Sequence, residues 1–282
     1  MIEHPLGTGT LTLAIDDHEG DGADEALFRI AERQNPKRAF LFVSTVLGRH
    51  IPVSAFRHRA ALDQLAEKLL AAPLGSRPVL VMSYAETAVG LGLGVFDGLC
   101  RKRPGLDVGY LPTTRLCPEG VRPWLNTREE HSHAAEHMVL PPDTGVLPDS
   151  GEVTLVLVDD ETTTGNTFKG LAEALHQAGL TVAHIVLVTL TDWSDGNCVT
   201  AIKTALPGIS VSALALLSGR YVWSPLPDGQ TRNLPPACPA ICPPWAPPPN
   251  AVFGVPRSGF DAPAMAADRQ AWAKYIDDHL CP

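Results

Sequence analysis

Short apolar runs alternate with stretches of helical periodicity along most of the chain. The runs have the length and the β-branched, apolar composition of buried strands, which are predicted at 39–46, 78–82, 107–111, 138–140, 153–158, 182–190 and 209–217. Apolar positions recur at helical spacing within 61–70 and 168–178, and the glycine-bearing stretch 86–99 has helical length. Gly179 is placed to end the helix at 168–178 in a left-handed conformation. Apolar strands that alternate with helices are typical of a mostly parallel sheet covered on both faces, so the predicted fold class is α/β.

Prolines divide the chain into two parts of different composition. Of the 26 prolines in 282 residues, eleven lie between Pro225 and Pro256. Proline cannot continue a helix or a central strand, so this stretch is predicted to be extended. A short amphipathic helix is expected after it, at about 264–280. The pattern therefore indicates a core of about 220 residues followed by a proline-stiffened extension of about 60.

The charge balance and the cysteines exclude some classes of protein. Asp and Glu number 31 against 22 Lys and Arg, a formal net charge of −9, whereas a nucleic-acid binder needs a basic surface that displaces counterions. No apolar run reaches the ~20 residues that span a bilayer, and the N-terminus lacks the pattern of a secretory signal. The six cysteines show no paired zinc-site spacing and are typical of free thiols in a reducing compartment. We therefore expect a cytoplasmic protein that binds neither nucleic acid nor membranes.

The strongest chemical signal follows the strand predicted at 153–158. Three acids, three threonines, a glycine, an asparagine and a fourth threonine stand in sequence from Asp159 to Thr167. Carboxylates at the end of a strand can receive sugar hydroxyls or a hydrated cation, and amides at the start of the next helix can bind a phosphate. Asp and Thr are also ordinary helix N-cap residues, but a cap needs one of them and not this whole series. The segment therefore predicts a polar turn that holds a phosphorylated sugar.

Two further segments carry candidate polar groups. The segment 83–88 connects a strand to a helix, and Glu86 has the alternative of being an ordinary acid near a helix start. The polar stretch 112–137 is too long for a simple connection, and such connections are usually functional or mobile. Its residues His131, His133 and His137 form an H-x-H-x3-H pattern, so a transition-metal site and a plain solvated loop are both alternatives there. Neither a dinucleotide GxGxxG pattern nor a GxxxxGK[ST] phosphate loop is present.

These motifs resemble those of the type I phosphoribosyltransferases. The fingerprint of that family for phosphoribosyl pyrophosphate (PRPP) has the same apolar strand, acid pair and Thr/Gly loop, and the chain departs from it at Glu161-Thr162, where many members have apolar residues. A narrower resemblance, over about 38–220, is to the orotate-phosphoribosyltransferase-like proteins of bacterial tellurium-resistance gene neighbourhoods. It rests on five pieces in order: GRHIP at 48–52, AETA at 85–88, TTR at 113–115, EHSH at 130–133 and the acid-pair loop.

The resemblance implies a fold, a cofactor and a set of ligand-binding residues. It implies the type I phosphoribosyltransferase fold over residues 1–220, with a small hood mainly in 1–75, followed by the proline-rich extension 221–282. Mg²⁺ would be the cofactor. PRPP would contact the acid-pair loop, namely Asp159, Asp160, Glu161, Thr162, Thr163, Thr164, Gly165, Asn166 and Thr167, with the metal at Asp159 and Asp160. Pyrophosphate would lie on the loop formed by Ala85, Glu86 and Thr87, which in this family often contains a strained peptide bond. The acceptor base would lie near Arg49 and His50, where a plain surface turn is the alternative.

The resemblance also implies an activity and a catalytic loop within 112–137. The candidate catalytic residues are Arg115, Glu130, His131, His133 and Asp160, and Arg115 would neutralise the departing pyrophosphate. The implied reaction is Mg²⁺-dependent transfer of the 5-phosphoribosyl group from PRPP to a nitrogenous base, or the reverse pyrophosphorolysis. The alternative function is a non-catalytic regulator that binds PRPP or a nucleotide. Orotate-type relatives are commonly homodimers, so we expect a homodimer; no motif specifies the acceptor base.

Overall fold

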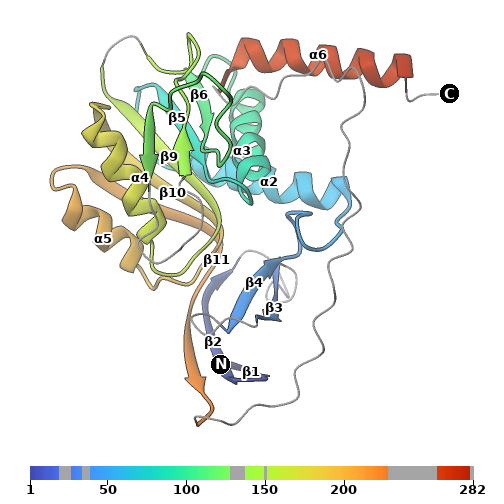
Figure 1. Cartoon of the computed structure of the whole chain (residues 1–282), viewed down its shortest axis with the longest axis vertical. Helices are drawn as coiled ribbons and strands as arrows, with labels where there is room; N and C mark the ends of the chain where they lie inside the picture. Colours follow the sequence, from blue (N-terminus) through green and yellow to red (C-terminus); the bar gives the residue numbers. More distant parts are fainter. Residues whose placement is uncertain (19–26, 34–38, 128–136, 149–150, 228–258, 280–282) are drawn as a thin grey trace.

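The computed structural model describes residues 1–18, 27–33, 39–127, 137–148, 151–227 and 259–279 of the chain. Its main sheet has eight strands in the order β1-β2-β11-β10-β9-β5-β6-β12 (Figure 1). The five central strands pair in parallel and are β11 (Ser210–Pro225), β10 (Val182–Asp192), β9 (Val153–Thr162), β5 (Val79–Ser83) and β6 (Val108–Pro112). The prediction of a mostly parallel α/β sheet is confirmed.

Helices cover both faces of this sheet (Figure 1). They are α2 (Ala55–Ala71) and α3 (Val89–Lys102) on one face, and α4 (Asn166–Gln177) and α5 (Asn197–Ala205) on the other. Successive side chains of a strand point to opposite faces of a sheet. In β9, Val156 and Val158 pack in the cluster of α2 and α3, while Leu155 and Leu157 pack in the cluster of α4 and α5. A strand buried on both faces has to be apolar at every position, which explains the continuous run that predicted it.

A separate hairpin stands beside the C-terminal ends of β9 and β10. It consists of β3 (Phe28–Glu32) and β4 (Phe40–Ser44), paired antiparallel. Phe42 stacks on Trp193, which follows β10, with ring centroids 4.5 Å apart, and Phe28 meets the same indole edge-on at 5.0 Å. Aromatic pairs of this kind stabilise a contact beyond the area they bury, so they hold the hairpin against the end of β10.

Both ends of the chain extend the sheet. The hairpin of β1 (Ile2–Leu6) and β2 (Gly9–His18), which the sequence pattern did not predict, pairs antiparallel with the second half of β11. Strand β11 therefore continues past the predicted domain boundary at residue 220, and the division itself stays a prediction. At the other edge β12 (Phe260–Asp261) pairs antiparallel with β6 and leads into α6 (Ala262–His279), which confirms the helix expected near 264–280.

Helix α6 is tied to the core by a charged cluster. Its residue Arg269 forms an ion pair with Asp97 of α3, whose side chain is 5% exposed. The same carboxylate also pairs with Arg59 of α2 and Arg101 of α3. A buried charge is tolerated when it is paired, so the three arginines stabilise Asp97 and join the C-terminal helix to α2 and α3.

The long polar stretch contains a strand of its own. The strand predicted at 138–140 is present as β8 (His137–Val139), but it lies outside the main sheet. It pairs antiparallel with β7 (Leu125–Thr127), a strand within the stretch that was predicted only as a connection. Residues 128–136 between them, including the candidate catalytic residues Glu130, His131 and His133, lie outside the described residues.

Candidate active site

The order of the strands marks one crevice of the sheet as the place for a ligand. From β5 the chain crosses to β6 on one side, and from β9 it crosses to β10 and β11 on the other, while β5 and β9 are neighbours. Ligands of open parallel sheets bind outside the carboxyl ends of the strands at such a reversal. The loop after β5 and the end of β9 are the two segments that carry the predicted pyrophosphate and PRPP residues. The topology therefore brings these two sequence motifs together.

The acid pair stands on a strand and not in a turn. The expected turn at 159 is wrong, because β9 keeps its parallel pairing with β10 through Thr162. The ladder of hydrogen bonds between the strands holds this part of the backbone, so Asp159, Asp160 and Glu161 project from a fixed frame. The Asp160 amide also donates to the Asp159 carboxylate at 2.9 Å.

The surroundings of Asp159 and Asp160 disfavour ionisation of both carboxyl groups. Burial is the largest cause that raises the pKa of Asp159, and the neighbouring charges of Asp160 and Glu161 raise it further. Burial also raises the pKa of Asp160, against hydrogen bonds and the nearby His50, which lower it. Adjacent half-buried carboxylates are costly to ionise without a compensating partner, so the strand end is suited to a cation or to donor hydroxyls.

A tight turn leads from the acids into α4. Gly165 precedes the helix with φ +75°, a left-handed conformation that favours glycine. A Cβ at this position would lie 2.5 Å from Cβ and 2.6 Å from Cα of Cys198 on α5, so the turn also packs closely against that helix. The first helical hydrogen bond runs from the Lys169 amide to the Gly165 carbonyl at 2.9 Å. The amides of Thr167 and Phe168 precede that bond, at the positive end of the helix where an anion is favoured.

The loop after β5 is hydrogen-bonded to the acid-pair loop. The Tyr84 hydroxyl donates to the Thr167 carbonyl at 3.1 Å, and the Ala85 amide donates to Oγ1 of Thr113 at 2.8 Å. The Ala85–Glu86 peptide bond is cis. Glu86 is exposed and Thr87 is half-buried, while Ala85 is buried. Two of the predicted ligand segments are thus held side by side by side-chain contacts.

A buried histidine that was not among the predicted site residues lies behind this loop. His137 contacts Oγ1 of Thr113 through Nδ1 at 3.1 Å and Nη2 of Arg115 through Nε2 at 3.2 Å. Both ring nitrogens are therefore engaged, which argues against the alternative that His137 is a metal ligand. The H-x-H-x3-H pattern pointed to this residue, but not to its contacts with Thr113 and Arg115, which follow β6. Arg115, predicted to be catalytic, is half-buried, and its Nε has no hydrogen-bond partner among the described residues.

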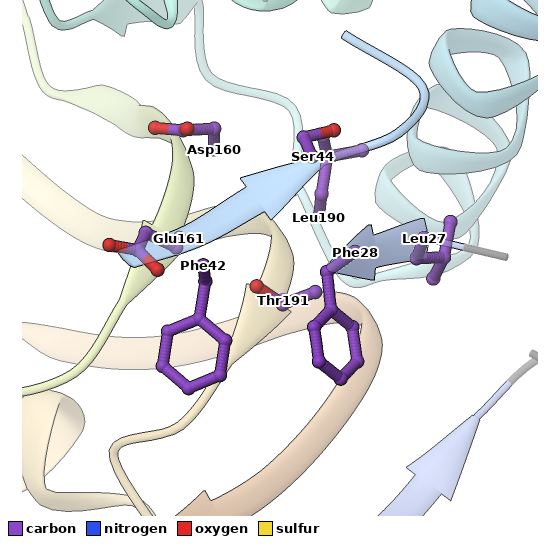
Figure 2. A pocket seen from close by; sticks show the side chains of 8 residues that line it. All are labelled: Leu27, Phe28, Phe42, Ser44, Asp160, Glu161, Leu190 and Thr191. Carbon is purple, nitrogen blue, oxygen red and sulfur yellow. The ribbon is translucent and has the colours of Figure 1, made fainter. Parts of the chain in front are cut away.

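The hairpin and the 48–52 turn border the acid pair. Figure 2 shows Phe42 next to Glu161 and Phe28 next to Thr191, and these four residues line a small cavity together with Asp160, Ser44, Leu27 and Leu190. A larger cleft of about 400 Å³ lies against the hairpin and is lined by Arg29, Ile30, Ala31, Leu41, Val43, His50 and Ile51. Of the two predicted base-binding residues, His50 lines this cleft, and Arg49 is exposed and outside its lining.

The acid pair fits a metal ion that brings most of its ligands with it. Among the described residues no three His, Cys, Asp or Glu side chains gather into a metal cage. Mg²⁺ is usually held by one or two carboxylates, with waters and substrate phosphates completing its octahedron. The carboxylates of Asp159 and Asp160, whose pKa values are raised, lie together at one strand end and match that donor set.

Within the described part of the chain, no helix is long and apolar enough to cross a membrane.

Comparison with known proteins gives the family. Residues 27–220 match the model of a family described as phosphoribosyl transferase. Because this match covers more than half of the chain, the chain belongs to that phosphoribosyltransferase family. No curated protein matches it.

Solved structures with a similar arrangement include two adenine phosphoribosyltransferases. The one from Trypanosoma brucei, in complex with AMP, pyrophosphate and ribose-5-phosphate, is 12% identical, with a TM-score of 0.45 over 68% of this chain and 76% of that chain. The one from Giardia lamblia, complexed with 9-deazaadenine, is 16% identical, with a TM-score of 0.45 over 68% of this chain and 94% of that chain.

Proposed function

We propose that this phosphoribosyltransferase moves the 5-phosphoribosyl group of PRPP to a nitrogen of a heterocyclic base, with release of pyrophosphate, and that it depends on Mg²⁺. The observation that carries the proposal is the hydrogen bond between Tyr84 and Thr167, which joins the two loops that we propose to bind anions, at the reversal of the sheet. PRPP carries a phosphate at one end of its ribose and a pyrophosphate at the other. Two adjacent loops suit a ligand with two anionic ends.

The acid-pair loop would hold the sugar and its 5-phosphate. The hydroxyls of Thr162 to Thr164 and the amides at the start of α4 would donate to the phosphate, and the helix dipole adds to their attraction. Asp159 and Asp160 would accept the ribose hydroxyls. Because these half-buried carboxylates lie beside one another, hydroxyl donors there also relieve an unfavourable charge pair.

The loop at 84–87 and Arg115 would hold the pyrophosphate. In the reaction the lone pair of the base nitrogen forms a bond to C1 of the ribose, the bond from C1 to the pyrophosphate oxygen breaks, and that oxygen keeps the electron pair. Negative charge therefore grows on the leaving group, where the guanidinium of Arg115 and the loop amides stabilise it. Mg²⁺ held by Asp159, Asp160 and the substrate would supply further positive charge at the same oxygens.

The cleft at the hairpin is the proposed place of the acceptor base. It combines apolar walls from Leu41, Val43 and Ile51 with the polar side chains of Arg29 and His50. Its volume of about 400 Å³ falls within the range of small-molecule sites. The charge of His50, which lines the cleft, lowers the pKa of Asp160, and this supports a base site on the His50 side of the proposed ribose site.

Three finer proposals rest on the sequence alone. On its five motifs, we place the chain in the orotate-transferase-like branch of bacterial tellurium-resistance gene neighbourhoods. Because orotate-type relatives are commonly homodimers, we propose a homodimer. On its composition, we propose a cytoplasmic location.

The experiment measures pyrophosphate and nucleotide formation from PRPP and Mg²⁺ with a panel of purine, pyrimidine and pyridine bases. We expect turnover with at least one base, and loss of turnover in the double variant Asp159→Asn/Asp160→Asn. Asp107→Asn is the matched control, because this exposed aspartate precedes β6 at the opposite edge of the sheet. Binding of PRPP without turnover on any base would instead favour a non-catalytic regulator, and absence of PRPP binding would refute both functions.

A further inference from the structure

Three segments that the proposed function needs are joined by one buried side chain. His137 is 4% exposed and begins β8. Its ring meets Tyr84 edge-on at 5.9 Å, Thr113 at Nδ1 and Arg115 at Nε2. Tyr84 belongs to the proposed pyrophosphate loop, and Thr113 and Arg115 follow β6. The histidine thus lies where the end of β5, the end of β6 and β8 meet.

The chemistry of these two neighbours points to one state of the imidazole. A guanidinium has donors and no acceptor, so Nε2 of His137 must accept from Nη2 of Arg115. A neutral imidazole has one donor and one acceptor, which leaves the proton on Nδ1, where it is donated to Oγ1 of Thr113 at 3.1 Å. The same hydroxyl oxygen accepts the Ala85 amide at 2.8 Å. Both hydrogen bonds to this oxygen satisfy buried polar groups.

The network has one consequence for each of two groups that would face pyrophosphate. On one side it anchors the Ala85 amide, and with it the backbone of the 84–87 loop. On the other it takes up one nitrogen of the Arg115 guanidinium and fixes the plane of that group. The Nε atom of Arg115 is buried and has no hydrogen-bond partner within the described ranges, which is the state of a donor held ready for an anion.

We propose that His137, as the neutral tautomer protonated at Nδ1, is a positioning residue that orients the Ala85 loop through Thr113 and the Arg115 guanidinium through Nε2 toward the leaving pyrophosphate. This role rests on the proposed transfer reaction. His137 itself touches no reacting atom. It acts on the transition state through Arg115 and on substrate binding through the loop.

Two substitutions separate the two arms of the network. The amide of Asn reaches the position of Nδ1, so His137→Asn keeps a donor for Thr113 and loses the acceptor for Arg115. The longer Gln reaches the position of Nε2, so His137→Gln keeps the acceptor for Arg115 and loses the donor for Thr113. We expect His137→Asn to lower kcat on the order of 10- to 100-fold with little change in the KM for PRPP. We expect His137→Gln to raise that KM about threefold to tenfold with a smaller effect on kcat.

A matched control and a second measurement keep the test decisive. His184→Gln alters a partly buried histidine near the start of β10, at the opposite end of the strand from the site, where it contacts Ser212 of β11. This variant should leave kcat and the KM for PRPP unchanged. Nitrogen NMR of ¹⁵N-histidine protein, with His137 assigned by its loss in His137→Gln, reads the tautomer independently of turnover. The Nδ1–H form is expected, and an Nε2–H or doubly protonated ring would overturn the proposal.

The kinetic results distinguish a positioning role of His137 from a purely structural one, and from failure of the transferase function. Equal losses in both variants, accompanied by equal losses of thermal stability, would show a purely structural residue and overturn the positioning role. Constants within twofold of the wild type in both variants would also overturn it. If the wild type itself turns over no base, the transferase function fails and the positioning role with it, whereas an active wild type with insensitive His137 variants refutes the positioning role alone.

Discussion

Replacement of Gly165 by alanine should strain the acid-pair loop and destabilise the protein. The size of the stability loss follows from the structure. The residue has φ +75°, and a side chain in the left-handed region costs about 1–2 kcal/mol. The added Cβ would also lie 2.6 Å from Cα of Cys198, a backbone atom that cannot move aside cheaply, and overpacking of this kind costs about 1–3 kcal/mol. The combined loss is about 2–5 kcal/mol in the free energy of unfolding. At about 2–4 °C for each kcal/mol, Tm should fall on the order of 10 °C.

The same helix supplies the control. Gly170 lies within α4, and a Cβ there would have no atom within 4 Å. Since glycine in a helix is less stable than alanine, Gly170→Ala should raise stability by about 0.5–1 kcal/mol. Thermal unfolding followed by circular dichroism gives Tm, and calorimetric titration with PRPP and Mg²⁺ gives affinity. We expect Gly165→Ala to bind PRPP at least about tenfold more weakly, because the loop must shift. A Gly165→Ala protein with the Tm and PRPP affinity of the wild type would refute the reasoning.

Two further predictions concern groups away from the site. Asp97→Asn removes the charge that three arginines share, and it should lower the free energy of unfolding by about 1–3 kcal/mol, because the half-exposed arginines can regain water. Glu67→Gln weakens the exposed ion pair with Lys102 and should lower it by less than about 1 kcal/mol. Equal losses in thermal unfolding of the two variants would contradict this prediction. Burial lowers the pKa of His184, so the unfolded chain takes up a proton before the folded one, and stability falls as the pH drops below about 6.5. His184→Gln should therefore lose less Tm than the wild type between about pH 7.5 and pH 5, and parallel losses would count against this.

The parallel core was predictable because burial on both faces leaves a continuous apolar run. The strand 153–158 could be identified for this reason, as could its neighbours at 78–82 and 182–190. The end of β9 could not, because polar residues at 159–162 look like a turn and are kept in the strand only by pairing with β10. There the turn propensity of the polar residues was overridden by hydrogen bonding to a strand that the local sequence does not reveal. The β2 strand has Leu11, Leu13 and Ile15 in alternation, a signal of period two that was present and missed.

The candidate site could be predicted as separate motifs, but the hydrogen-bond network around His137 could not. Local sequence carries the acid-pair loop and the 83–88 loop, and the order of the strands brings them together. The contacts of His137 cross from β8 to the end of β6, so no spacing in the sequence reveals them. The docking of α6 through Arg269 is of the same kind, because it joins residues more than a hundred positions apart.

The most direct test of the account is a crystal structure of the protein with PRPP and Mg²⁺. We expect the 5-phosphate at the hydroxyls and amides of residues 162–168, the ribose hydroxyls at Asp159 and Asp160, and the pyrophosphate between the 84–87 loop and Arg115. PRPP bound in the reverse orientation, or away from the ends of β5 and β9, would contradict the central claim that these two loops together hold the two anionic ends of one substrate.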